Sequence, residues 1–215
     1  MNKGVVSVLV AYLIWGLYPF YFHAMQHVAP AEIVIHRVLW TFALLAVYLF
    51  CSRRWRWIQK AVTDRRTVAV FLMSSVLITA NWSTYTYAIV TNQTLEASLG
   101  YFMNPLVSVL LGTVFLKEKL NKAQMLAIVF ACAGVMWVTF KQGEFPALGL
   151  TLALSFGFYG LVRKMAPLGS LEGLTLETAF AFPVALLATF YFAGNGDLTF
   201  VHGTSWDKFW LIMAG

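Results

Sequence analysis

The sequence predicts an all-α fold, a polytopic bundle of membrane-spanning helices. Of its 215 residues, 60% are hydrophobic and only 11% are charged, whereas a water-soluble domain carries about 25% charged residues. The mean hydropathy is +0.73, and long apolar runs follow one another along the chain with short connections between them. A single soluble core of this size could not bury so much apolar surface, so we expect the helices to lie in lipid.

Seven apolar stretches are long enough, or nearly so, to cross the hydrocarbon layer, which takes about 20 residues of helix. They are residues 4–22, 31–51, 67–90, 95–116, 123–140, 147–162 and 174–193. The first stretch lacks a small-residue cleavage site, so we expect a retained helix rather than a signal peptide. An eighth stretch begins at Lys208 and is too short to cross before Gly215. The two cysteines lie within apolar runs and predict no disulfide framework.

The distribution of lysine and arginine predicts a cytoplasmic N-terminus. Twelve of the fifteen Lys and Arg residues precede the first helix or follow the second, fourth and sixth helices, all on one side. Lys141 and Lys208 fall on the other side, and Arg37 lies within a helix. Because cytoplasmic loops carry the excess of positive charge, we expect a multi-pass membrane protein with its N-terminus in the cytoplasm. This topology explains the net charge of +6 without a nucleic-acid partner, and Trp55 and Trp57 are interpreted as part of a membrane-surface loop.

An internal repeat relates the two halves of the chain. The second and seventh apolar stretches resemble each other at an offset of 140 positions, which sets Phe42 against Phe182. A unit with an odd number of helices crosses the membrane in the opposite direction when it is repeated, and inverted repeats are common in secondary transporters. We therefore expect a first five-helix unit in residues 1–140 and the start of a second, inverted unit in residues 141–215. Because the second unit stops within its third helix, we expect a truncated or partial form of a longer protein.

Arg37 gives the clearest indication of function. It lies about seven residues inside the second helix, roughly 10 Å deep at 1.5 Å per residue. An arginine at mid-helix costs about 2.5–3.5 kcal/mol on insertion scales, so such residues face a cavity or a partner. We interpret Arg37, with His36 beside it, as an anchor for an anionic or zwitterionic substrate. The alternatives are snorkelling to the outer headgroups and a structural pair with Glu96 of the fourth helix.

The fourth apolar stretch carries polar groups that would not be needed on a helix surrounded only by lipid. Glu96 follows Thr94, the expected N-cap, and a carboxylate in a first turn is favoured by the helix dipole; binding of a coupling ion or proton is the alternative. Pro105 removes a helical hydrogen bond and, with Asn104, predicts a kink that faces a cavity or a packed neighbour. Glu177, about six residues inside the seventh helix, is a second intramembrane carboxylate with a coupling or a structural role.

Amide and aromatic side chains recur in the first, third, fourth and sixth helices. Asn81 and Tyr85 lie one turn apart on the third helix and suit a polar-aromatic binding wall. Hydrogen bonds between helices would require the same residue types, so both interpretations are open. Besides His36 and Arg37, the candidate substrate-binding residues are Trp15, Asn81, Trp82, Tyr85, Tyr101, Asn104 and Tyr159.

Several other classes of protein are disfavoured. HExxH, GxSxG, Walker and CxxC motifs are absent from the sequence, so we expect no enzyme, cofactor or metal site. A retinal protein would need an intramembrane lysine, and every lysine lies at a helix end. Small residues at four-residue spacing, Ser108 with Gly112 and Ala127 with Ala131 beside Gly134, predict close packing between helices or between the subunits of a homodimer.

Taken together, the motifs resemble the EamA family of the drug/metabolite transporter superfamily. The resemblance covers the whole chain and rests on AYLIWGLYPFYF (11–22), EIVIHRVLW (32–40), NW (81–82), LEASLGYFMNPLVSVLLG (95–112), FLKEKL (115–120) and LALSFGFYGLVRK (152–164). The family pattern of a mid-helix proline, a cytoplasmic glutamate and a glycine in the following helix maps onto Pro105, Glu118 and Gly134.

The resemblance implies two inverted five-helix units around a central cavity. It also implies a secondary transporter, an exporter or permease, that moves small organic solutes such as amino acids, metabolites or drugs by alternating access without ATP. The expected partners are therefore a small-molecule solute and membrane lipid. The alternative is a truncated, non-transporting membrane fragment or scaffold.

Overall fold

The computed structural model describes residues 3–53 and 55–215, which form helices and short connections and contain no strand. Arg54, counted above among the cytoplasmic cations, lies outside the described residues, as does the side chain of Lys3. The helices are α1 (Lys3–His23), α2 (Pro30–Ser52), α3 (Arg56–Thr63), α4 (Arg65–Val90), α5 (Thr94–Phe115), α6 (Lys122–Gln142), α7 (Ala147–Lys164), α8 (Ser170–Asn195), α9 (Thr199–His202) and α10 (Ser205–Ile212).

Each of the seven predicted spans is a helix, and the all-α bundle is confirmed. Six of the described helices, α1, α2, α4, α5, α6 and α8, are long and apolar enough to cross a membrane. The prediction of seven such spans is not met at α7. α7 has only 18 residues, and these include the charged residues Arg163 and Lys164 at its end.

The connection between α2 and α4 was expected to be a loop, but it contains the short helix α3. Trp57 of α3 packs against a buried cluster that includes Ala61, Phe71 and Leu176. Trp55 remains exposed and stacks edge-on against Phe50. Trp57 therefore belongs to the packed part of the molecule, because one face of α3 covers the ends of α4 and α8.

Local signals explain where several helices begin and end. Asp64 caps α4 by accepting a hydrogen bond from the Thr67 backbone N–H at 3.0 Å. Thr204 and Asp207 form a reciprocal capping box at the start of α10, which satisfies two otherwise unpaired N–H groups. α6 ends at Gly143, whose φ of 72° is the left-handed conformation that glycine adopts without strain.

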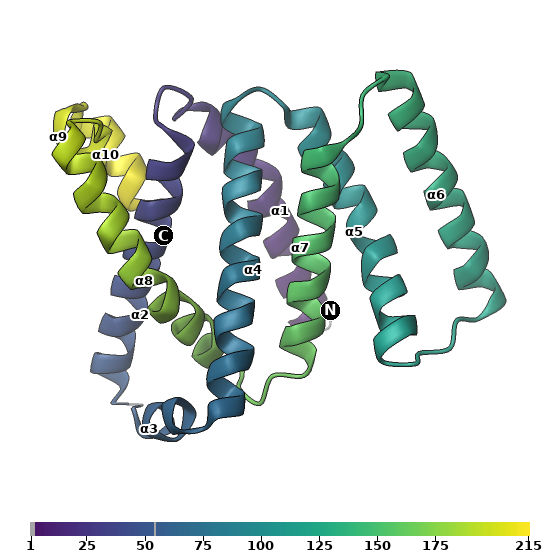
Figure 1. Ribbon diagram of the computed structural model, residues 1–215, viewed down its shortest axis with the longest axis horizontal. Helices are drawn as coiled ribbons and strands as arrows, with labels where there is room; N and C mark the ends of the chain where they lie inside the picture. Colours follow the sequence, from purple (N-terminus) through teal and green to yellow (C-terminus); the bar gives the residue numbers. More distant parts are fainter. Residues whose placement is uncertain (1–2, 54) are drawn as a thin grey trace.

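Helix α4 occupies the middle of the bundle (Figure 1) and packs against α7, α8 and α2. α5 packs along α7, and α6 lies at the edge of the bundle against α5. α2 packs against α8, where the Phe42 and Phe182 rings meet with centroids 4.6 Å apart. Sequence-distant helices therefore form the centre, while α1 and α6 are largely unburied and present exposed apolar side chains of the kind that contact lipid.

Two glycines bring α5 and α7 close together. A Cβ atom on Gly100 would lie 2.9 Å from the Gly149 carbonyl oxygen, and one on Gly149 would lie 3.0 Å from the Glu96 carbonyl oxygen. Both are shorter than ordinary van der Waals contacts, so a larger residue at either position would push the helices apart. Gly100 and Gly149 therefore have a packing role between α5 and α7.

The two small-residue faces have different surroundings. Ser108 and Gly112 face α7, because they line a groove together with Gly157 and Gly160. Ala127 and Ala131 are exposed on α6, and space for a Cβ atom on Gly134 is open. The homodimer prediction is not tested by this single chain.

Candidate substrate site

The core of the candidate site is Arg37, on the second turn of α2. Its guanidinium lies over the Trp82 ring of α4, 4.3 Å from the ring centroid, and 5.8 Å from the centroid of Tyr18 on α1. Cation–π contacts of this kind hold a cation in a desolvated place while leaving the N–H groups in the guanidinium plane available. The structure therefore brings together Arg37 and Trp82, two of the predicted residues.

Phenol groups complete the surroundings of Arg37. Tyr18, Tyr21, Tyr85 and Tyr101 lie close enough for electrostatic interaction with the guanidinium. The Tyr85 ring meets the Tyr101 ring edge-on at 5.7 Å and also contacts Phe22. Within the described chain, Arg37 has no carboxylate within 4 Å. A buried cation so placed among aromatic rings is suited to an anionic group brought by a ligand.

The alternative of a structural pair between Arg37 and Glu96 does not hold in this structure. The Glu96 carboxylate instead accepts a hydrogen bond from the Leu148 N–H, at 3.1 Å, in the first turn of α7. Thr94 is the first residue of α5 rather than its N-cap, and its carbonyl accepts from Ser98. Glu96 lies in the first turn of α5, as predicted, and it also caps the start of α7, because α5 and α7 are in close contact.

His36 does not join Arg37, because consecutive helical residues point about 100° apart. Its ring stacks against Phe200, with centroids 4.6 Å apart, and Nδ1 accepts a hydrogen bond from Trp40 at 3.2 Å. Nε2 is buried without a hydrogen bond, 4.0 Å from the Glu32 carboxylate. Glu32 itself accepts from the Thr199 and Phe200 backbone N–H groups. His36 therefore belongs to the junction of α2 with α9.

Asn81 takes the interhelical alternative. Its side-chain amide donates to the Leu152 carbonyl and to the Ser155 hydroxyl of α7, both at 3.1 Å. Beside it lies a cavity of about 10 Å³, lined in part by Tyr101 and Asn104, which is about the smallest volume that holds one water. Asn81, Tyr101 and Asn104 thus line one small cavity at a packed junction of α4, α5 and α7.

The remaining two aromatic candidates separate. Trp15 is 50% exposed on α1 and stacks edge-on with Tyr12, away from Arg37. Tyr159 of α7 donates a hydrogen bond to the Glu177 carboxylate at 3.3 Å. Trp15 therefore contributes nothing to the Arg37 cluster, and Tyr159 belongs to a second polar centre.

That second centre surrounds Glu177, which is only 1% exposed. Ser74 of α4 donates to its Oε1 at 2.8 Å, and Ser75 donates to its backbone carbonyl at 2.7 Å. Arg163 Nε lies 3.6 Å from the same Oε1. Sequence reasoning counted Arg163 as a loop cation and missed both serines. In the sequence, Gly173 could have indicated that another side chain approaches this helix closely. In the structure, a Cβ atom on Gly173 would overlap Arg163 Nη1.

The three residues of the family pattern lie within α5 (Pro105), in the connection from α5 to α6 (Glu118) and on α6 (Gly134). Glu118 pairs with Lys164 of α7 at 2.5 Å, and its carboxylate lies over Gly112. This pair borders the groove between α5 and α7, about 230 Å³ in volume. Pro105 lies inside α5 and is exposed, and Gly134 is exposed on α6. Of the three, Glu118 has an evident contact role in this structure.

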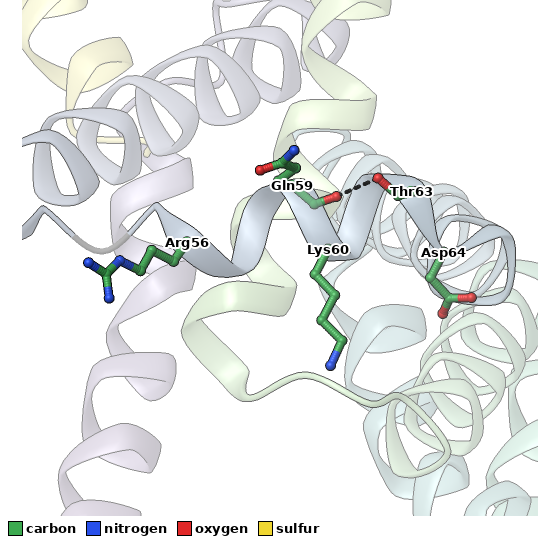
Figure 2. A pocket seen from close by; sticks show the side chains of 5 residues that line it. All are labelled: Arg56, Gln59, Lys60, Thr63 and Asp64. Carbon is green, nitrogen blue, oxygen red and sulfur yellow. Dashed lines mark hydrogen bonds between the residues drawn. The ribbon is translucent and has the colours of Figure 1, made fainter.

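A larger hollow lies away from both polar centres. Figure 2 shows an open groove along α3 and the start of α4, about 470 Å³ in volume, lined by Arg56, Gln59, Lys60, Thr63 and Asp64. The Thr63 hydroxyl donates to the Gln59 carbonyl within it. All five residues come from one surface segment, so the groove is a feature of the α3 surface. Across the described part of the chain, no group of three or more His, Cys, Asp or Glu residues is placed to hold a metal ion.

An apolar multi-helix bundle with a desolvated cation and a buried carboxylate at its centre is typical of membrane transport proteins. The chain belongs to the EamA-like transporter family, whose model matches residues 2–140. No solved structure matches the chain.

Three curated relatives illustrate the similarity. The chain is 38% identical to an uncharacterised transporter of Pseudomonas aeruginosa, over all of this chain and 72% of that protein. It is 42% identical to an uncharacterised transporter of Bacillus subtilis, over 86% of this chain and 63% of that protein. It is 39% identical to Protein RarD of Escherichia coli, over 90% of this chain and 66% of that protein. The chain therefore spans about two thirds of the length of these relatives.

Proposed function

We propose that the chain forms the solute-binding part of a secondary transporter that moves small organic solutes across the bacterial cytoplasmic membrane by alternating access. The observation that carries the proposal is Arg37, which lies over Trp82 and Tyr18 without a carboxylate partner in the described chain. An intramembrane cation without a protein counterion suits a substrate that supplies the anionic group. Aromatic rings around it suit the organic part of an amino acid or an amphipathic metabolite.

Inverted repeats support the same proposal. Phe42 and Phe182, which are 140 positions apart, contact each other, as equivalent residues near a two-fold axis would. At the same offset, the cap formed by Asp64 and Thr67 at α4 matches the Thr204–Asp207 capping box at α10. We therefore propose a first unit over residues 1–140 and an inverted second unit that begins in residues 141–215.

The orientation is part of the proposal. Most described cations, including those of α3 and the end of α7, lie on the side predicted to be cytoplasmic. Relatives named as transporters agree with a transport role and give no indication of an enzyme. The proposed partners are a small-molecule solute and membrane lipid.

Substitutions at Arg37 test the function. The assay measures uptake of labelled amino acids by vesicles that contain protein expressed at the length of its relatives. We expect Arg37→Lys to reduce uptake about tenfold or more with normal expression, because lysine keeps the charge and loses the planar two-pronged donor geometry. Lys141→Leu is the matched control, because Lys141 also lies over an aromatic ring, Trp137, at 5.5 Å, on the unburied helix α6.

The possible results separate two questions. Wild-type uptake by Arg37→Leu would remove Arg37 from the site. Uptake of no organic solute by the wild-type protein, or a requirement for ATP hydrolysis, would contradict the transport proposal itself. If the wild-type protein takes up no organic solute, the alternative of a non-transporting scaffold would be favoured.

A further inference from the structure

Glu177 differs from Glu32 and Asp207, the other buried carboxylates of the described chain, because each of those accepts a hydrogen bond from a backbone N–H group. Glu32, also 1% exposed, accepts hydrogen bonds from two backbone N–H groups, whose positions are fixed by α9. The Glu177 carboxylate is held by side chains alone: the Ser74 hydroxyl, the Tyr159 phenol and the Arg163 guanidinium. Side chains can turn, so the surroundings of Glu177 can adapt to a change in its charge.

Two of the three partners of Glu177, Ser74 and Arg163, have another hydrogen bond to use. The Ser74 hydroxyl is also 3.2 Å from the Phe71 carbonyl. Arg163 donates from Nη2 to the Gly169 carbonyl at 3.2 Å and lies over the Phe71 ring at 5.2 Å. If Glu177 lost its negative charge, Ser74 and Arg163 would therefore each keep another contact. A buried pair without such reserves is strongly destabilised when one partner is neutralised.

The two oxygens of Glu177 are not equivalent. Oε1 accepts from Ser74 at 2.8 Å and faces Arg163 at 3.6 Å, whereas Oε2 accepts only from Tyr159, at 3.3 Å. Oε2 is the less strongly bound oxygen and the one on which a proton costs least. After protonation, the new O–H can donate to the Tyr159 oxygen, since a phenol also accepts hydrogen bonds.

The titratable groups that face Glu177 are few. α7 contributes Arg163 and Tyr159, and α4 contributes only the Ser74 and Ser75 hydroxyls. α2 also packs against α8, yet none of its described titratable residues contacts the carboxylate. Protonation of Glu177 thus changes the charge of one pair, Glu177 with Arg163, and no wider network of acids.

We propose that Glu177 is the proton-binding site that couples transport to a proton gradient. One proton adds to Oε2, an O–H bond forms, the ion pair with Arg163 is neutralised, and the hydroxyls of Ser74 and Tyr159 reorient. Release of the proton restores the arrangement seen here, which ties α4, α7 and α8 together. The inference rests on the proposed transport function, but proton binding itself can be measured without any solute.

The test is a pH-difference infrared titration of the purified wild-type protein, with the proton as the probe. We expect a C=O band of a buried protonated carboxyl group to appear as the pH falls, and to be missing in Glu177→Gln. Glu172→Gln is the matched control on the same helix, because Glu172 only caps its own helix at Gly169 and the amide oxygen can keep that bond. A band that persists in Glu177→Gln, or that is absent from the wild-type protein, overturns the proposal.

Two further measurements keep the test decisive. If Glu177→Gln does not fold, Tyr159→Phe keeps the carboxyl group and removes one hydrogen bond, so the band should remain and shift in frequency; an unshifted band overturns the assignment. In vesicles, Glu177→Gln should lose the stimulation of amino-acid uptake by a proton gradient and keep solute exchange within about twofold of wild type. Gradient-driven uptake by this variant contradicts the coupling role, whereas loss of all uptake by the wild-type protein, with the infrared band intact, contradicts only the transport function.

Discussion

Gly173 lies under the guanidinium of Arg163, and there is no room for a side chain at this position. A Cβ atom there would be 1.8 Å from Arg163 Nη1 and 2.5 Å from Cζ. The Nη1 atom is buried without a hydrogen bond, and a Cβ atom at position 173 would displace the guanidinium from its place beside Glu177. The absence of one side chain thus allows an arginine to enter the bundle.

We expect Gly173→Ala to destabilise the protein by about 1–3 kcal/mol, the cost of adding a methyl group to a filled space. Unfolding in detergent would measure the change. Gly160→Ala is the control, because a Cβ atom there meets nothing within 4 Å. Equal stability of the two variants would show that Arg163 does not occupy this position.

The residue scale also shows what the sequence could and could not reveal about the site. Arg37 was predicted because one arginine within an apolar helix is visible without any partner. Arg163 was not, because it stands at a helix end beside Lys164, where a surface cation is the ordinary interpretation. Ser74 and Glu177 are 103 positions apart, and their contact depends on how α4 and α8 pack, which hydropathy does not specify.

At the scale of single elements, Asp64 governs the start of α4. The side-chain hydroxyl of Thr67, then its backbone N–H, donate to the carboxylate and hold the pKa of Asp64 below its usual value. A carboxyl group whose pKa is lower in the folded state than in the unfolded state stabilises the folded state. This stabilisation is fully present above the unfolded pKa of about 3.9 and is lost as the pH falls through the folded pKa. The cap should therefore weaken only in acid.

We expect Asp64→Asn to match the wild-type protein in thermal stability at a pH below the lowered pKa of folded Asp64, and to lack the wild-type gain above the unfolded pKa of about 3.9 that ionisation of Asp64 supplies. Asparagine is a comparable N-cap without a charge, so the difference between the two proteins isolates the ionisation. Identical pH dependence in both proteins would contradict the assignment.

Glu96 acts across elements, since it lies in α5 and caps α7. We expect Glu96→Ala to cost about 0.5–2 kcal/mol, as other N-cap losses do, and to speed hydrogen exchange of the Leu148 amide. Glu96→Gln keeps an acceptor oxygen and should stay close to wild type. Unchanged exchange at Leu148 in Glu96→Ala would mean that the bond is not formed in the membrane.

The whole molecule raises the question of whether α7 crosses the membrane, because its composition alone leaves it out of the six apolar spans. The packing of α7 against α4 and α5 gives it neighbours other than lipid along much of its length, which relaxes the need for an apolar surface. Hydropathy predicted the helices well for this reason: it reports contact with lipid. It missed the short helix α3, and although it predicted α4 and α7, it gave no indication that these two helices pack against each other.

Reporter fusions test the crossing. A reporter after Phe145 should read as external and one after Met165 as cytoplasmic, because α7 lies between them and the cations Arg163 and Lys164 favour the cytoplasmic side. A fusion after Thr63, in the basic α3 segment, provides the cytoplasmic standard. Readings on the same side for Phe145 and Met165 would remove α7 as a crossing and, with it, the inverted repeat.

The contact between Phe42 and Phe182 has a consequence for motion. If the two units exchange shapes during a cycle, each adopting the form that the other had, the atoms closest to the two-fold axis move least. The two rings would then serve as a pivot that stays together in both forms, while other contacts between the helices open and close around it. Bulk at the pivot would therefore set how far α2 and α8 can rock, and hence the size of the solute that passes.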